Sequence, residues 1–167
     1  MWSEAVKKHL RLQGIARGPI VTAEQVVVFE KRYGVQLPGD VREYFEEFNG
    51  SELGSGGPMD DQLLAFWHLS EVRPLSEELP DSSIPQADRY FVFADHSIWV
   101  HAYAIRLSSD PSESTPVVVV YDAAVGEVAP SMSAFFERYL AGDQTTLYPD
   151  PANLRQVTPG SNEHAHS

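Results

Sequence analysis

The sequence predicts an α+β fold in which a mostly antiparallel sheet of about four or more strands is covered by helices. Three observations support this prediction. Apolar residues recur at helical spacing in three segments, residues 22–33, 38–48 and 131–140. β-Branched and aromatic residues dominate three later runs, residues 90–94, 98–107 and 116–121. The polar loop SSDPSEST joins the last two runs and suits an antiparallel hairpin.

The composition fits one domain of ordinary size. At 167 residues the chain can bury a core without disulfides or metals. It contains no cysteine, which excludes disulfide bonds, thiolate nucleophiles and cysteine-ligated zinc. The first residues, MWSEAVKKHLRLQG, carry charges throughout and lack the apolar core of a secretory signal. No stretch approaches the ~18 apolar residues that span a bilayer, so we expect a soluble cytoplasmic protein.

The charge of the chain is strongly negative and unevenly distributed. There are 24 acidic and 12 basic residues, for a net charge of −12, and the excess of acid lies after Arg32. Such a surface repels phosphate groups, so direct binding to nucleic acid or to an anionic membrane is disfavoured and a cationic partner is favoured. High acidity is also a common route to solubility, and that alternative stays open.

The N-terminal residues 2–12 are expected to form a short helix that ends near Gly14. One side of this helix is apolar, with Trp2, Val6 and Leu10. Because an apolar side needs to be covered, we expect the helix to lay Trp2 on the main body.

A second helix is expected to begin after Thr22. The Thr22 hydroxyl and the Gln25 amide can satisfy two backbone N–H groups as a capping box. Apolar residues continue at helical spacing to Tyr33, and Gly34 is placed to end the helix. The run Val26–Val28 has strand propensity and opposes this prediction.

The rest of the prediction is organised around residues 33–50, YGVQLPGDVREYFEEFNG. Pro38 suits a first helical position, since the N–H that it lacks is not needed there. An apolar stripe follows at helical spacing: Val41, Tyr44, Phe45 and Phe48. Acidic residues lie largely outside the stripe: Asp40, Glu43, Glu46 and Glu47. This acidic face is either a solvated helix surface or a contact surface.

The following stretch, GSELGSGGPMDD at residues 50–61, is too rich in glycine for regular structure and is expected to form a loop. It lacks the Gly-Lys-Ser/Thr ending of a phosphate-binding loop, and its carboxylates at Glu52, Asp60 and Asp61 would repel phosphate. Residues 63–69 are expected to form a strand. Residues 70–79 are expected to form a turn and a short helix, because Pro74 prevents a longer one.

The last part of the chain is expected to contain the three strands and a closing helix. In the second strand run the bulky residues Trp99, Tyr103, Ile105 and Leu107 share parity. Residues 122–126 are expected to turn the chain. The helix at residues 131–140 carries core residues at helical spacing, Met132, Phe135, Phe136, Tyr139 and Leu140, and Gly142 is placed to stop it. A polar tail interrupted by prolines follows.

The sequence offers no constellation typical of catalysis or of a metal centre. Histidine occurs six times, but no HxH or HExxH pattern falls on an expected helix or strand; His164 and His166 lie in the tail, where they could bind stray metal. No GxSxG motif is present. Asp95-His96-Ser97 has triad residue types, but neighbours on a tight segment cannot converge as a triad does. We therefore predict no cofactor and no metal site, and a binding function rather than an enzyme.

The succession of segments resembles the SUKH superfamily, the Smi/Knr-type cell-wall assembly regulator and bacterial immunity domain. The resemblance covers residues 20–142 and is carried by Tyr33-Gly34, by Leu37-Pro38, by the aromatic-rich helix that ends in Asn49-Gly50, and by Ser131 and Phe135. Residues 1–19 are then an N-terminal helical extension and residues 143–167 a polar C-terminal tail. The chain departs from the family pattern at residues 95–97, which are shorter and less rich in glycine than the usual turn.

The resemblance implies a single α+β domain without catalysis. Many bacterial members are immunity proteins that bind and block toxins, often nucleases or deaminases, whereas eukaryotic relatives are regulatory interaction modules. The leading hypothesis is a cytoplasmic immunity protein that neutralises a basic cognate toxin. Its candidate partner-binding face comprises Asp40, Glu43, Glu46, Glu47, Glu52, Asp60 and Asp61. The alternatives are a regulatory or scaffold module without a toxin partner, and an unfamiliar enzyme. The sequence does not determine the oligomeric state.

Overall fold

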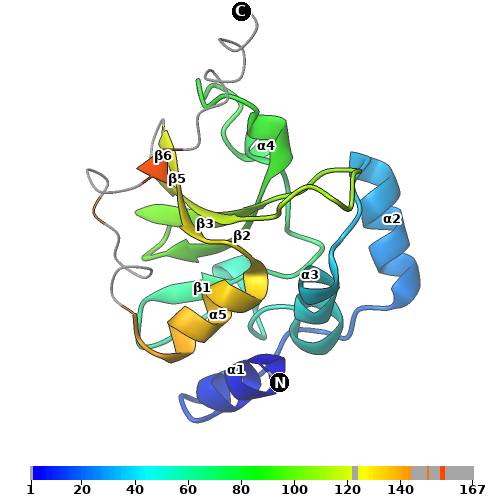
Figure 1. Ribbon diagram of the computed structural model, residues 1–167. Helices are drawn as coiled ribbons and strands as arrows, with labels where there is room; N and C mark the ends of the chain where they lie inside the picture. The colour runs from blue at the N-terminus through cyan, green and yellow to red at the C-terminus, as the bar shows by residue number, and fades with distance from the viewer. Residues whose placement is uncertain (1, 122–123, 144–149, 151–154, 157–167) are drawn as a thin grey trace, which may run out of the picture.

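The computed structural model describes residues 2–121, 124–143, 150 and 155–156, and one antiparallel sheet forms its centre (Figure 1). The strands follow one another across the sheet in chain order. They are β1 (Leu64–Phe66), β2 (Tyr90–His96), β3 (His101–Arg106), β4 (Val117–Tyr121), β5 (Ala124–Ala129) and the two-residue β6 (Arg155–Gln156). The predicted α+β class and the antiparallel hairpin between β3 and β4 are confirmed.

Two strands are shorter than predicted. β1 covers only the middle of the expected strand at residues 63–69, because Leu63 has a left-handed φ of 65°. β3 begins at His101, because residues 97–100 form a turn after β2. Trp99 therefore lies in that turn and does not continue the strand face of Tyr103 and Ile105.

The prediction for the end of the sheet is partly wrong. Residues 124–126, expected to turn the chain, are already the beginning of β5. Gly126 and Glu127 weaken the strand pattern of this segment, but pairing with β4 on one side and β6 on the other overrides that local preference. β6 falls within the expected polar tail; residues 144–149, 151–154 and 157–167 of that tail, which include His164 and His166, lie outside the described residues.

The predicted ends of α2 (Ala23–Tyr33) are confirmed. Gln25 N donates to Thr22 Oγ1 at 3.2 Å, and Thr22 N donates to Gln25 Oε1 at 2.8 Å, which completes the capping box. Gly34 ends the helix with a left-handed φ of 64°. Val28 lies on the exposed side of the helix.

The central helix has two parts, α3 (Gly39–Glu43) and the π-helical turn η1 (Tyr44–Phe48). Pro38 precedes the first turn and is not its first residue, since its ψ of 164° is extended. The whole predicted apolar stripe is buried. Asn49 N closes the wide last turn by donating to Tyr44 O at 2.6 Å, and Asn49 itself has a left-handed φ of 54°.

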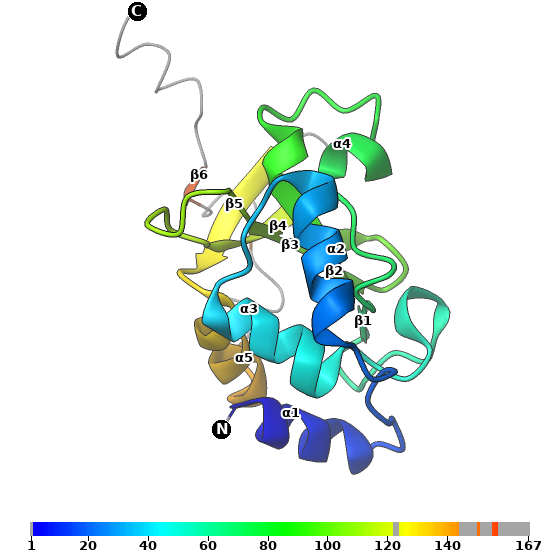
Figure 2. The same ribbon diagram turned by 90° about the vertical axis from the view of Figure 1, so that its right-hand side faces the viewer.

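Helices cover one face of the sheet in two layers (Figures 1 and 2). α3, η1 and α5 (Met132–Leu140) lie next to the strands, and α1 (Trp2–Arg11) lies outside them. Aromatic rings fill the space between the first layer and the sheet, where Phe93 contacts both Tyr44 and Phe135. As expected, Trp2 rests on the main body, stacked on Phe136 with ring centroids 4.7 Å apart.

The opposite side of the sheet carries less cover. The short helix α4 (Leu75–Glu78) and the segment that follows it lie on this side, with Leu75 and Ile84 buried. The 3₁₀ turn η3 (Ala87–Arg89) leads from there into β2. None of the described helices is long and apolar enough to cross a lipid bilayer.

Candidate partner-binding surface

Three of the seven candidate carboxylates serve the fold. Asp40 Oδ2 accepts a hydrogen bond of 2.9 Å from Ser133 N in the first turn of α5. Glu43 Oε2 accepts one of 2.7 Å from Ser3 Oγ and so joins α3 to α1. Asp60 is only 4% exposed. These roles depend on tertiary contacts that helical spacing does not reveal.

Asp60 is a buried carboxylate with a full set of donors. It accepts hydrogen bonds from Gln62 N at 2.9 Å, from Leu64 N at 2.8 Å and from the Tyr139 hydroxyl of α5. Burial raises the pKa of the Asp60 carboxyl, and these donors oppose the rise. The group ties the loop before β1 to α5, which is a structural role.

The other candidates are more accessible. Glu46 is half-buried beside Arg42, with the charged atoms 3.5 Å apart. Glu47, Glu52 and Asp61 are exposed. All three lie beside residues 12–22, the segment that connects α1 to α2. Arg17 Nη1 donates to Glu47 O at 2.8 Å, Glu52 N donates to Ala16 O, and Asp61 N donates to Gln13 Oε1. We call Glu47, Glu52 and Asp61 the acidic rim.

The Asn49-Gly50 pair forms the corner that follows the central helix. Asn49 Oδ1 accepts from Leu69 N at 2.7 Å, and Asn49 Nδ2 donates to Pro19 O at 2.9 Å. Gly50 has a φ of 75°, and a Cβ there would lie 2.5 Å from Trp67 O. The pair therefore holds three chain segments in close contact, which only these residue types allow.

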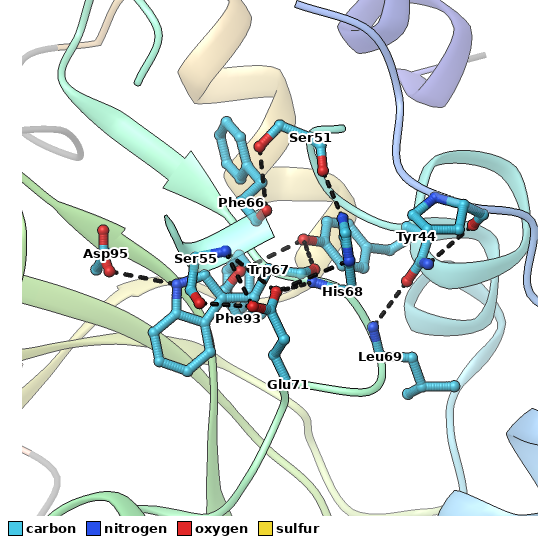
Figure 3. A network of polar contacts seen from close by, with 12 residues as sticks. Tyr44, Ser51, Ser55, Phe66, Trp67, His68, Leu69, Glu71, Phe93 and Asp95 are labelled. Carbon is cyan, nitrogen blue, oxygen red and sulfur yellow. Dashed lines mark hydrogen bonds and ion pairs between the residues drawn. The ribbon is translucent and has the colours of Figure 1, made fainter. Parts of the chain in front are cut away.

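Polar contacts extend from this corner to the less covered side of the sheet (Figure 3). His68 Nε2 lies 2.6 Å from Ser51 O, and His68 N donates to Glu71 Oε1. The backbone N–H and the hydroxyl of Ser55 both donate to the Glu71 carboxylate. The Trp67 indole N–H donates to Asp95 Oδ2 at 3.3 Å. The network thus fixes Glu71 and Trp67 beside β2.

A hollow of about 590 Å³ opens beside these residues. Its walls include two tryptophans, Trp67 and Trp99, whose ring centroids are 6.3 Å apart. Polar residues complete the lining, namely Arg32, Ser55, Ser70, Glu71, Arg73, Glu78 and Asp95, together with Ile98. We call this the indole hollow. Ser55 connects it to the loop that carries Glu52 of the acidic rim.

The turn between β2 and β3 forms one side of the indole hollow and has an unusual backbone. Ser97, Ile98 and Trp99 all have left-handed φ angles, between 50° and 65°. This conformation is disfavoured for non-glycine residues, most of all for a β-branched one. Ile98 is 81% exposed and Val100 66% exposed, so the turn presents apolar side chains to solvent next to the two indoles.

Asp95 is an acid of the indole hollow whose pKa is raised. It is 4% exposed, and burial raises the pKa of its carboxyl to about 6, while the Trp67 N–H opposes the rise and the negative charge of Glu71 adds to it. Arg32 and Arg73 are both exposed, and Arg73 forms an ion pair with Glu78. The inner end of the hollow is therefore acidic, and the arginines belong to its outer end.

A second groove, of about 560 Å³, runs between α2 and residues 68–73. It shares Arg32, Ser70 and Arg73 with the indole hollow. Its walls are mostly apolar and include the exposed side chains of Ile20 and Val28. The two hollows together form one continuous open surface from α2 to the β2–β3 turn.

The histidines of the described chain do not form a metal site. No group of three or more metal-ligating side chains gathers within the described residues. His96 and His101 do share a face of the sheet, because the turn between them makes them partners on neighbouring strands, with stacked rings 4.5 Å apart.

Sequence reasoning missed the indole hollow. Trp67, Asp95 and Trp99 come from three different segments, and each appeared in the sequence as part of a strand or of a tight turn. The only local signal was the unusual segment Asp95-His96-Ser97, which departs from the family pattern at the base of the strained turn.

The comparisons with known proteins identify a family for most of the chain. The family model described as the SMI1/KNR4 family (SUKH-1) matches residues 20–138. This region extends from just before α2 into α5 and includes every lining residue of the indole hollow and all but Pro19 of the second groove, whereas α1 precedes it. No curated protein and no solved structure matches the chain significantly.

Proposed function

The chain belongs to the SMI1/KNR4 family (SUKH-1), and from this premise we propose that it is an immunity protein that binds and neutralises a cognate bacterial toxin. The family includes immunity proteins, and its members are generally non-catalytic immunity or regulatory domains. The toxin is a basic protein, a nuclease or another nucleic-acid-modifying enzyme. Neutralisation is stoichiometric, by occupation of the toxin surface that receives nucleic acid.

The observation that carries the proposal is the exposure of the acidic rim on a chain of net charge −12. Glu47, Glu52 and Asp61 all face solvent along one connection. A positively charged surface that binds nucleic acid is complementary to such a rim. Carboxylates that the fold already uses, Asp40, Glu43 and Asp60, supply negative potential without direct contact.

The rim and the two hollows have different parts in binding. Charge on the rim speeds encounter with a basic partner but contributes less to the final affinity. Affinity comes from apolar and aromatic groups that lose contact with water at the centre of an interface. Ile98, Trp99 and Val28 are such groups, and they line the open surface beside the rim.

Co-expression with the product of the neighbouring toxin gene tests the proposal. The wild-type chain is expected to co-purify with that product and to inhibit its activity at a one-to-one ratio. Reversal of the rim charges by Glu47→Lys, Glu52→Lys and Asp61→Lys is expected to weaken the complex. A matched triple reversal elsewhere, Asp81→Lys, Asp88→Lys and Glu137→Lys, gives the same net charge and is expected to weaken it less.

Two results would contradict the proposal at different levels. If the wild-type chain neither binds nor inhibits the toxin, the immunity function is wrong, and a regulatory or scaffold module takes its place. If the wild-type chain binds but both triple reversals have the same effect, the acidic rim is not the contact surface. Circular dichroism of each variant establishes that the fold is intact.

A further inference from the structure

We propose that the indole hollow receives one arginine side chain of the partner protein, which packs against the wall formed by Trp67 and Trp99 and pairs with the carboxylate of Asp95. This inference rests on the proposed function, since it names the group by which the partner is recognised. It also concerns residues outside the acidic rim. Ile98 and Val100 then pack against apolar surface around the bound arginine.

The shape of the hollow suits a flat cationic group. The two indole rings contact each other edge to face, with centroids 6.3 Å apart and planes inclined at 63°, so together they form one aromatic wall of the hollow. A guanidinium group is planar, stacks on aromatic rings and is attracted by their π-electrons. Trp67 is held in place by Asp95 and by its backbone N–H, which donates to Phe93 O at 2.8 Å.

The charges of the inner end call for a cation. Asp95 Oδ2 accepts the Trp67 N–H, and no other described residue donates to this carboxylate. The charged side chain that acts on it is Glu71, of the same sign. A buried carboxylate with one donor and a negative neighbour is poorly stabilised, and an arginine could donate two hydrogen bonds to it.

The arginines that line the hollow are engaged at its outer end. Arg73 forms an ion pair with Glu78, and Arg32 lies over the Tyr33 ring at 5.2 Å. Glu71 already accepts hydrogen bonds from Ser55 and His68, so its position is fixed. Asp95 therefore attracts the partner cation to the inner end of the hollow, and Arg32 and Arg73 repel it from the outer end.

The strained turn supports the assignment of this place as a contact surface. Ile98 has a φ of 57° and exposes 81% of its surface, so neither the backbone nor the side chain is in a favourable state in the free protein. Ser97 N donates to Leu63 O and Val100 N donates to His96 O, which hold the turn in position. A partner that covers Ile98 and Val100 compensates for this unfavourable state.

A small probe tests the hollow without the toxin. N-acetylarginine amide is titrated into the full chain carrying Trp2→Phe, in which Trp67 and Trp99 are the remaining tryptophans, and their fluorescence is followed at constant ionic strength. We expect a saturable change with the arginine probe and none with N-acetylcitrulline amide, its neutral isostere. Asp95→Asn is expected to abolish the response, and Asp88→Asn, which removes one exposed charge elsewhere, to preserve it.

Other responses overturn the proposal. An equal response to the citrulline probe or to N-acetylvaline amide would mean that the hollow recognises shape or apolar surface and not charge. No saturable response, or an unchanged response in Asp95→Asn, would also contradict it. If Asp95→Asn fails to fold, Trp99→Ala provides the second variant, because Trp99 lies in a solvent-facing turn.

The complex with the toxin distinguishes this inference from the proposed function. Asp95→Asn and Trp99→Ala are each expected to weaken a complex that the wild-type chain forms by about tenfold or more. If the wild-type chain binds the toxin and both variants bind equally well, the arginine site is wrong and the immunity function stands. If the wild-type chain binds no toxin but discriminates the arginine probe, the function fails and the site stands.

Discussion

Asp95 shows at the scale of one residue how a binding group can destabilise the free protein. Its carboxyl has an ordinary pKa of 3.8, which burial raises to about 6 in the folded chain. Between these two values the folded state binds more protons than the unfolded state. Stability conferred at acidic pH is therefore lost as the pH rises through this window, by about 3 kcal/mol at most.

The first prediction concerns Asp95→Asn, which removes the titrating group and keeps an acceptor for the Trp67 N–H. Relative to wild type, the variant is expected to gain about 2–3 kcal/mol in free energy of unfolding near pH 7 and little near pH 4. Urea denaturation at the two pH values measures the change. Because all other titrating groups are common to both proteins, an equal difference at both pH values would contradict the raised pKa.

The sequence predicted residues whose role is set by local spacing, and it missed roles set by tertiary contacts. The apolar stripe from Val41 to Phe48 and the capping residues Thr22 and Gln25 follow from helical geometry alone. Asp60 looks like a solvated loop residue until Tyr139 of α5 is placed against it. Asp95 and Trp67 become neighbours only when β1 pairs with β2.

Among the elements, the end of the central helix depends most strictly on one residue. Gly50 combines a φ of 75° with a site where a Cβ would lie 2.5 Å from Trp67 O and 2.6 Å from Phe66 O. Any side chain at this position would force η1 away from the segment that carries Trp67. The helix end and the indole hollow are thereby coupled through the backbone.

The second prediction compares two glycines of the same helical unit. Gly50→Ala is expected to lower the free energy of unfolding by about 3 kcal/mol or more, because of both the clash and the positive φ. Gly39→Ala is the matched control: its Cβ would meet nothing within 4 Å, and the change is expected to stabilise by about 0.5–1 kcal/mol. Thermal and urea unfolding measure both effects. Similar effects of the two substitutions would show that the close approach at Gly50 is not essential.

Element boundaries could be predicted where a residue imposes a backbone conformation. Gly34 and the Asn49-Gly50 pair mark helix ends for this reason. β5 escaped prediction because Gly126 and Glu127 oppose a strand locally, and only pairing with β4 and β6 stabilises it. The β2–β3 turn escaped because a left-handed Ile98 has no sequence signature.

At the scale of the whole molecule, charge and shape are divided between neighbouring regions. The acidic rim lies along the connection between α1 and α2; residues 19–22 of that connection also line the second groove, and Ser55 joins the loop that contains Glu52 to the indole hollow. Long-range attraction by the rim and short-range recognition in the hollows are thus carried by different residues. This division allows the two contributions to be separated by kinetics.

The third prediction uses ionic strength to separate them. Salt screens exposed charges over about 8–10 Å and affects encounter more than contacts already desolvated. The association rate constant with the toxin is therefore expected to fall by tenfold or more from about 50 to 500 mM NaCl, with a much smaller change in dissociation. Stopped-flow fluorescence or surface plasmon resonance measures both rates.

The rim variant and the Asp95 variant should differ in which rate constant they change and in whether association still depends on salt. Reversal of Glu47, Glu52 and Asp61 to lysine removes rim attraction, so association should become slow and nearly independent of salt. Asp95→Asn leaves the rim intact, so association should keep its salt dependence while dissociation becomes faster. If the rim reversal changed only the dissociation rate, or if Asp95→Asn changed only the association rate, the assigned roles would be wrong. The rim would then provide recognition, and the hollow would provide electrostatic steering.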